Sequence, residues 1–453
     1  MSSSPAPAPP APPAPTGPPL QKETTAGNYF VANYPPFAFW KPDAIPALNS
    51  VLDRNPGPNA PRLGLYTHIP FCRKRCHFCY FRVYTDKNAE EIKGYLDALL
   101  AELEVYARKP WIQGRKPRFL YFGGGTPSYL SPDQLRFLSD GMKRLLPWDE
   151  AEEVTFEGEP GTLTDHKLRA IRDLGVTRLS LGIEHFDDHI LEVNGRAHRS
   201  KEVHRAYAYA REIGFPQINI DLIAGMVEET EDRWKEAVAK AVELQPDSLT
   251  VYQMEVPYNT GIYQQMKAQG QLVAPVADWE TKRRWVDYAF REFEQVGYAM
   301  NSTSTVVRDP AKVKFLYREG LFSGADLLSV GVASFGHING VHYQNQADFD
   351  PYLAKVNAGE LPIFRAYPTQ PDERYIREFM LMLKLGSNSR ASFKAKFGTD
   401  PLEQFPAPLA LLKDWGCLTV EGDRILLTRD ALLQVDRLLM EFFKPEHRST
   451  RYA

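Results

Sequence analysis

The sequence predicts an α/β fold, a partial (β/α)6 barrel followed by a C-terminal, mostly helical, winged-helix-like domain. Two observations predict this fold. From residue 63 onward, short apolar runs alternate about six times with helical patterns, which favours a parallel sheet with crossover helices, closed or partly closed into a barrel. After residue 371 the pattern changes to an apolar helix, a further helix, a short hairpin and a last helix, the outline of a winged helix.

The strands are predicted at six apolar runs, namely 63–70, 118–127, 153–160, 177–186, 217–225 and 247–256. The helix after the first run carries its apolar residues at a spacing of three and four, on one face: Ile92, Tyr95, Leu96, Leu99, Leu103 and Tyr106. Ser131 is predicted to cap the next helix with Pro132 at its first position, and Thr164 can cap a third. The glycine-punctuated segment 327–346 is expected to be irregular.

These patterns divide the chain into five predicted regions. They are a disordered Pro/Ala-rich tail (1–27), an N-terminal extension (28–62), the barrel (63–300), a linker and substrate-cavity segment (301–370), and the C-terminal domain (371–453). The tail lacks the basic and apolar regions of a secretory signal.

The charge and cysteine content exclude several classes of protein. The 453 residues carry a formal net charge of −3, so nothing indicates a nucleic-acid partner, and the chain has no apolar run long enough to predict a membrane span. Three of the four cysteines are clustered, which does not fit the disulfide framework of a secreted protein. We therefore expect a cytoplasmic protein.

The stretch HIPFCRKRCHFCYF follows the first predicted strand and places Cys72, Cys76 and Cys79 within eight positions. A closed zinc site needs four ligands, and His68 or His77 could complete one. A [4Fe-4S] cluster also needs four ligand positions, and three thiolates leave one iron open for a small-molecule ligand. Zinc sites usually have two ligand pairs far apart in sequence, whereas this chain has one group of three cysteines, which favours the [4Fe-4S] cluster over zinc. The fourth cysteine, Cys417, is expected to be a buried apolar residue of the C-terminal hairpin.

The cysteine spacing resembles that of the radical S-adenosylmethionine (SAM) superfamily. The segments LYTHIPFCRKRCHFCYF, YFGGGTPSYL, TRLSLGIEHF, NIDLIAGM and GVASFGHINGVHYQNQ are similar, in the same order, to those of the oxygen-independent coproporphyrinogen III oxidase-like family. The resemblance implies a radical SAM barrel with a [4Fe-4S] cluster held by the three cysteines. It also implies one or two molecules of SAM, which the cluster cleaves to a 5′-deoxyadenosyl radical, and an electron donor such as flavodoxin or ferredoxin. The substrate would be a small molecule, for which a tetrapyrrole is a candidate.

The same resemblance assigns candidate cofactor-binding residues. Those that match contacts of the first SAM are Tyr66, Phe78, Gly124, Gly125, Thr126, Glu157, Arg196 and Asp221. At positions aligned with a second SAM, this chain departs from the oxidase and has Glu184, Glu255 and Phe335. The two added carboxylates could bind a cationic group, repel a tetracarboxylate substrate, or be ordinary substitutions in a rearranged pocket. No catalytic residue is assigned.

Three functions follow from the resemblance. The first is oxidative decarboxylation of propionates in porphyrin and haem biosynthesis, as in coproporphyrinogen dehydrogenase. The second is a radical SAM methyltransferase or cyclopropanating activity, and the third is haem binding by a chaperone. The HNxxYW motif of the chaperone branch is missing from this sequence. His337 and His342 either line the substrate cavity or have a structural role.

Overall fold

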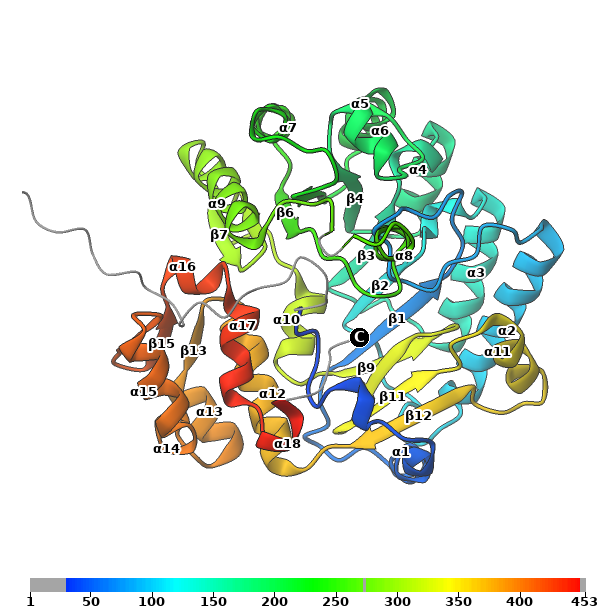
Figure 1. Ribbon diagram of the computed structural model, residues 1–453. Coiled ribbons are helices and arrows are strands. Elements are labelled where there is room, and N and C mark those ends of the chain that lie inside the picture. The colour runs from blue at the N-terminus through cyan, green and yellow to red at the C-terminus, as the bar shows by residue number, and fades with distance from the viewer. Residues whose placement is uncertain (1–29, 272–273, 449–453) are drawn as a thin grey trace, which may run out of the picture.

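A computed structural model of the chain describes residues 30–271 and 274–448. The predicted tail, 1–27, lies outside the described residues. In the described part, a 12-stranded sheet runs through the molecule (Figure 1). Its middle consists of six neighbouring parallel strands in chain order: β1 (Leu63–Ile69), β2 (Phe119–Gly124), β3 (Glu153–Gly158), β4 (Arg178–Glu184), β5 (Gln217–Ala224) and β6 (Ser248–Gln253). The sheet curves without closing, so the predicted partial (β/α)6 barrel is confirmed.

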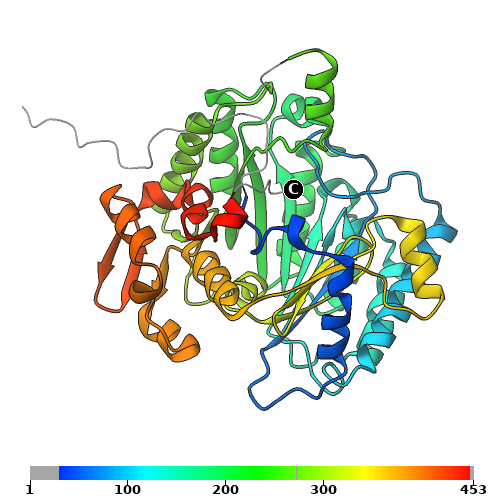
Figure 2. The same ribbon diagram turned by 60° about the horizontal axis from the view of Figure 1, so that its bottom comes forward.

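Helices connect the parallel strands and cover the outer face of the sheet (Figure 2). They are α2 (Ala89–Ala107), α3 (Pro132–Leu145), α4 (Asp165–Asp173), α5 (Asp188–Val193), α6 (Ser200–Glu212) and α7 (Glu231–Leu244), with α8 (Gly261–Ala268) and α9 (Trp279–Gln295) after β6. The predicted apolar face of α2 is buried. Ser131 caps α3 and Thr164 caps α4, as predicted, because each side-chain oxygen accepts a backbone N–H of the first turn.

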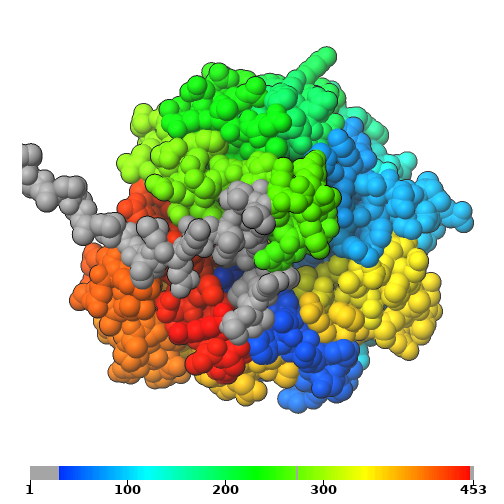
Figure 3. All heavy atoms as spheres, viewed as in Figure 1, coloured from blue at the N-terminus to red at the C-terminus, as the bar shows by residue number. Residues whose placement is uncertain are grey.

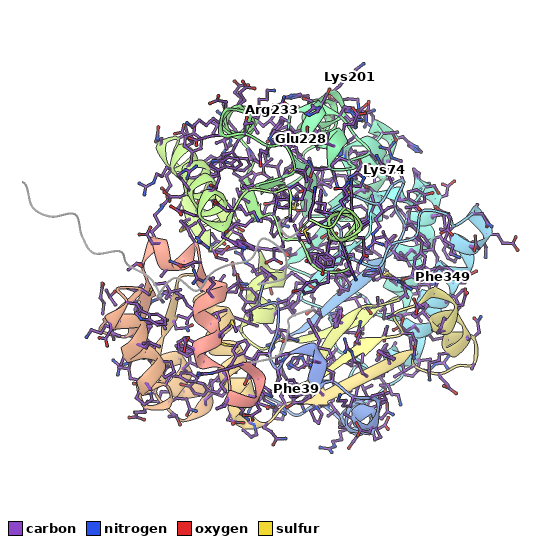
Figure 4. The ribbon with its side chains drawn as sticks, viewed as in Figure 1. Phe39, Lys74, Lys201, Glu228, Arg233 and Phe349 are labelled. Atoms are coloured by element: carbon purple, nitrogen blue, oxygen red, sulfur yellow. The ribbon has the colours of Figure 1, made fainter. Side chains whose placement is uncertain are left out.

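The sheet continues beyond the barrel at both edges. At one edge β9 (Asp326–Val330) runs parallel to β1 and is followed by antiparallel β10 (Phe335–Ile338), β11 (Val341–Asn345) and β12 (Ile363–Pro368). At the other edge lie β8 (Thr305–Val307) and β7 (Ala299–Ser302). The remaining helices of this region are α10 (Leu316–Phe322) and α11 (Phe349–Asn357). Phe349, labelled in Figure 4, stacks on Tyr95 of α2 with ring centroids 5.6 Å apart.

The expectation that 327–346 is irregular is wrong. Gly331 and Gly340 lie at the turns of this segment and allow the three strands β9, β10 and β11 to pair. Asn339 and Gly340 both have positive φ (45° and 80°), as a two-residue hairpin between β10 and β11 requires. His337 and His342 face each other across this hairpin, and both are buried. His342 stacks on Trp40, so its role is structural.

The C-terminal domain packs beside the barrel. It consists of α12 (Pro371–Leu383), β13 (Ser387–Ser389), α13 (Arg390–Phe397), α14 (Pro401–Gln404), α15 (Pro406–Asp414), β14 (Leu418–Glu421), β15 (Arg424–Leu427), α16 (Arg429–Leu432), α17 (Val435–Leu439) and α18 (Pro445–Arg448). The small sheet β13-β15-β14 confirms the winged-helix-like outline. Cys417 is buried in this core, as predicted.

The N-terminal segment also belongs to this domain. After it come the short helix α1 (Ile45–Leu52) and β1. Val31 and Tyr34 are buried in the core of the C-terminal domain, and the backbone N–H of Val31 donates to Asp436 Oδ1 at 2.8 Å. In the space-filling view the blue N-terminal residues lie beside the red C-terminal helices (Figure 3). No helix in the described ranges has the length and apolar character that crossing a membrane requires.

Candidate active site

A cavity of about 470 Å³ lies at the C-terminal ends of the parallel strands. Alternate residues of the strands face it, because side chains of a strand alternate between its two sides. On β4 these residues are Arg178, Ser180, Gly182 and Glu184. The C-terminal domain completes the wall with Leu433, Gln434, Asp436 and Arg437. The cavity therefore lies between the barrel and the second domain.

The three clustered cysteines line this cavity. Their loop leaves β1 at Pro70 and is fixed at its start, where the N–H of Cys72 donates to the carbonyl of Tyr84 at 3.0 Å. Farther along, the N–H of Cys79 donates to the carbonyl of Cys76 at 3.1 Å. Burial raises the pKa of the Cys72 thiol to about 12 and that of Cys79 to about 11. Both thiols therefore stay protonated at neutral pH unless a metal centre binds them as thiolates.

The two histidines considered as zinc ligands lie outside the cavity wall. The Nδ1 atom of His77 bonds to the carbonyl of Val193 at 3.0 Å, and its ring packs on Gly195. The Nδ1 atom of His68 bonds to the hydroxyl of Tyr66 at 3.0 Å. Neither imidazole is placed to complete a closed four-ligand site with the three thiols. The donor set that faces the cavity fits a cluster with one open iron.

The glycine loop after β2 packs directly beneath the first thiol. The N–H of Gly125 donates to the carbonyl of Ile69 at 2.8 Å, which holds the two loops together. A Cβ atom at Gly125 would lie 2.9 Å from the carbonyl carbon of Pro70 and 3.0 Å from Cys72 Sγ. Thr126 Oγ1 lies 3.2 Å from the same sulfur. Only glycine at position 125 allows this approach of backbone to the cysteine loop.

Two half-buried carboxylates, Glu157 and Asp221, line the middle of the cavity. Glu157 accepts hydrogen bonds from Tyr121 Oη at 2.5 Å and from the N–H of Gly124 at 3.2 Å. Burial raises its pKa to about 7. Asp221 accepts from Ser180 Oγ at 3.1 Å and from Asn219 Nδ2 at 2.9 Å, and burial raises its pKa as well. Asp221 therefore has hydrogen-bond donors within the barrel itself.

Arg196 and Glu184 form the wall next to the cysteine loop. The guanidinium of Arg196 donates to Cys76 Sγ at 3.2 Å and to the carbonyl of Gly182 at 2.5 Å, and it lies 3.7 Å from Glu184 Oε1. Glu184 ends β4 with a φ of 66°, an uncommon conformation for a residue other than glycine. Burial raises its pKa to about 7. Its charge is therefore only partly present at neutral pH, which weakens the repulsion that a second carboxylate would meet.

Not every predicted site residue reaches the cavity. Phe78 and Glu255 line it, together with the cysteines, the glycine loop, the acids and Arg196. Tyr66 lies behind the wall and stacks on Tyr121, with ring centroids 6.0 Å apart. Phe335 lies apart from the others, because its ring packs on Phe37 and Trp40 at 4.7 Å and 5.8 Å.

Some residues of the cavity wall are not among the predicted site residues, for example Arg178, Tyr252 and Phe315. The sequence does contain one signal for Arg178. Side chains two, four or six positions apart on a strand point to the same side of the sheet, so Arg178 is expected on the same side as the predicted site residue Glu184.

The comparisons with known proteins agree with this site. A family model described as the radical SAM superfamily matches residues 66–241, which include the cysteine loop, the glycine loop, Glu157 and Asp221. This match identifies a radical SAM domain in this part of the chain. Such a domain implies a [4Fe-4S] cluster and SAM, and the three cavity-facing thiols fit that cluster.

Within the radical SAM superfamily, the chain resembles the oxygen-independent coproporphyrinogen III oxidase group. It is 29% identical over 370 residues to the heme chaperone HemW of Bacillus subtilis, covering 81% of this chain and 96% of that protein. It is 28% identical over 331 residues to the oxygen-independent coproporphyrinogen III oxidase of Escherichia coli, covering 71% of each. The solved structure of that oxidase, HemN, superposes with a TM-score of 0.77 at 26% identity, covering 91% of this chain and 96% of that one.

Proposed function

We propose that this protein is a radical SAM enzyme that oxidatively decarboxylates propionate side chains of a tetrapyrrole. The observation that carries the proposal is that one cavity combines the three thiols, the carboxylates of Glu157 and Asp221, and residues of the C-terminal domain. The cofactors and a substrate held by the second domain would thus meet in one chamber. Similarity to the E. coli oxidase over most of both chains supports the choice of substrate.

The chain's own residues have defined tasks in this proposal. When bound, the cluster and SAM supply a carbon radical that takes a hydrogen atom from the propionate. Cys72, Cys76 and Cys79 would hold the cluster, and the guanidinium of Arg196 lies against one of these sulfurs. Glu157 would accept a hydroxyl or ammonium donor of SAM, since its carboxylate faces the cavity. The substrate radical would then lose carbon dioxide and pass one electron to an external one-electron acceptor, such as an oxidised flavin or iron–sulfur carrier, and a vinyl group would remain.

The test is anaerobic turnover of the reconstituted protein with SAM, a reductant and coproporphyrinogen III. We expect protoporphyrinogen, with SAM cleaved to 5′-deoxyadenosine, as measured by mass spectrometry. Cys76→Ala should abolish both products. Cys417→Ala is the matched control, because that cysteine is buried in the other core and should leave the cluster in place. Normal SAM cleavage without decarboxylation would eliminate the proposed activity. Transfer of labelled SAM carbon to the product would instead indicate the methyltransferase or cyclopropanating alternative.

Haem binding is the second candidate function. It is favoured by the similarity to the Bacillus subtilis heme chaperone, of which this chain covers 96%. Titration with haem distinguishes the two candidates. A chaperone should shift the Soret band at one haem per chain and should not convert coproporphyrinogen. No spectral change at stoichiometric haem would remove this candidate.

A further inference from the structure

Arg178 is a buried cation at the base of the cavity. It is the first residue of β4, is only 3% exposed, and lines the cavity with its side chain. Its guanidinium carbon lies 4.0 Å from the centroid of the Phe315 ring. At this distance the ring and the cation attract each other, and the N–H groups of a guanidinium can still donate to a planar acceptor.

The guanidinium has no acceptor among the residues that the structure describes. No described carboxylate lies within ion-pair distance of it, and its Nη1 atom is fully buried without a hydrogen-bond partner. Burying a charged donor without an acceptor is unfavourable, because the hydrogen bonds that the group loses with water are not replaced. An arginine placed this way at a cavity wall indicates an acceptor that comes from the cavity.

The nearby acids do not fill this role, because their oxygens are engaged elsewhere. Glu153 accepts from the N–H groups of Leu316 at 2.6 Å and Tyr317 at 3.2 Å. Glu157 and Asp221 accept from the tyrosine, serine, asparagine and backbone donors described above. Electrostatic attraction to these carboxylates makes burial of the Arg178 guanidinium less unfavourable, but none of them accepts a hydrogen bond from it.

A second guanidinium lies near Phe315 but does not line the cavity. The guanidinium carbon of Arg318 is 5.3 Å from the centroid of the Phe315 ring. Arg318 donates to Ser302 Oγ at 2.8 Å, to Thr305 Oγ1 at 2.9 Å and to Asn301 Oδ1, while its Nε atom is buried without an acceptor. Its positive charge adds to that of Arg178 and favours an anion at this end of the cavity.

We propose that Arg178 binds a carboxylate of the substrate at the base of the cavity. The planar fork of a guanidinium matches the two oxygens of a carboxylate. A tetracarboxylate held there by one propionate would enter the barrel between the two domains. This inference rests on the proposed function for the choice of substrate. A carboxylate could also come from the amino-acid end of SAM, so the test separates the two sources.

The experiment compares ligands with and without negative charge. The probes are coproporphyrin III and its tetraamide, which keeps the macrocycle and removes the charges, and both are titrated by fluorescence into the reconstituted protein. The variants are Arg178→Gln and Arg178→Lys, with Arg136→Gln as an exposed control whose ion pair is with Asp133 on the surface. We expect Arg178→Gln to weaken coproporphyrin III binding about tenfold or more. Binding of the tetraamide and of SAM should not change, and Arg178→Lys should recover part of the affinity. Iron content and thermal unfolding verify that each variant is folded and carries its cluster.

Each other outcome has a defined meaning. Equal loss for both porphyrins, or no loss for either, overturns the carboxylate site and leaves the proposed function standing. Loss of SAM affinity with unchanged coproporphyrin binding assigns the arginine to SAM and overturns its role toward the substrate. If the wild type binds no coproporphyrin, the proposed function is wrong about the substrate. The carboxylate site is then tested separately with glutarate, a simple dicarboxylate. Thermal stabilisation by glutarate of the wild type but not of Arg178→Gln keeps the site for another carboxylate, and no stabilisation overturns it.

Discussion

The contact between the glycine loop and the cysteine loop predicts the effect of a single methyl group. In Gly125→Ala the new Cβ would lie 2.9 Å from the Pro70 carbonyl carbon and 3.0 Å from Cys72 Sγ, where ordinary contacts begin at 3.4 Å. The loops must therefore separate by 3.4 − 2.9 = 0.5 Å on one side and 3.4 − 3.0 = 0.4 Å on the other. The Pro70 neighbour is backbone, and the Cys72 sulfur is the end of a short side chain that must keep its place to bind the cluster. Overpacking of this kind costs about 1–3 kcal/mol.

We expect Gly125→Ala to lower thermal stability and to displace the first cluster ligand. The iron bound after anaerobic reconstitution and the visible absorption of the cluster should both fall, and SAM affinity should fall with them. Gly94→Ala is the matched control. Gly94 is exposed on α2 and a Cβ there meets nothing within 4 Å, so this change should stabilise the protein by about 0.5–1 kcal/mol. A Gly125→Ala protein with full iron, unchanged SAM affinity and unchanged stability would refute the reasoning.

Two further predictions concern charge. Glu157 has a folded-state pKa of about 7, above its ordinary value of 4.5, so wild-type stability should fall as pH rises through this window, because the unfolded chain releases the proton first. The free energy of unfolding, measured with urea, should therefore fall between pH 5.5 and 8 by about 2 kcal/mol less in Glu157→Gln than in the wild type. An equal fall in both proteins would contradict the raised pKa. Lys74 is exposed in the cysteine loop between two other exposed cations, and Figure 4 labels it. Lys74→Glu should slow cluster reduction by an acidic flavodoxin several-fold at low salt while reduction by dithionite is unchanged. Lys312→Glu, on the exposed segment after β8, is the control, and equal slowing in both variants would exclude a docking role for the cysteine loop.

The parts of the fold that the sequence predicts correctly are those with local signals. The six parallel strands carry regularly spaced apolar residues, and helices between them start at capping residues such as Ser131 and Thr164, so pattern and structure agree. The edge strands β9 to β11 were missed because they are short and rich in glycine, and their pairing depends on partners distant in sequence. The predicted place of Phe335 depended on alignment alone, and the hairpin directs its ring toward Phe37 instead.

The site follows the same division. The cysteine and glycine loops are contiguous motifs, and the structure places them in contact. Arg178 carries no motif, and its position is defined only when β4 pairs with its neighbours and Phe315 arrives from more than a hundred residues later in the chain. The lack of a hydrogen-bond acceptor for Arg178 among the described residues depends on how the strands assemble. It therefore could not be predicted from the neighbouring residues in the sequence.

The burial of Val31 and Tyr34 in the C-terminal core has a consequence for the order in which the molecule is assembled during synthesis. The hydrogen bond from Val31 to Asp436 joins residues separated by 405 positions. Val31 leaves the ribosome early, but this bond can form only after nearly all of the described chain has been synthesised. The barrel strands and the cysteine loop are complete long before that contact can form. In a nascent chain the three thiols therefore line a cavity that still lacks the wall supplied by the C-terminal domain. The cavity is complete only when the two ends of the described chain meet.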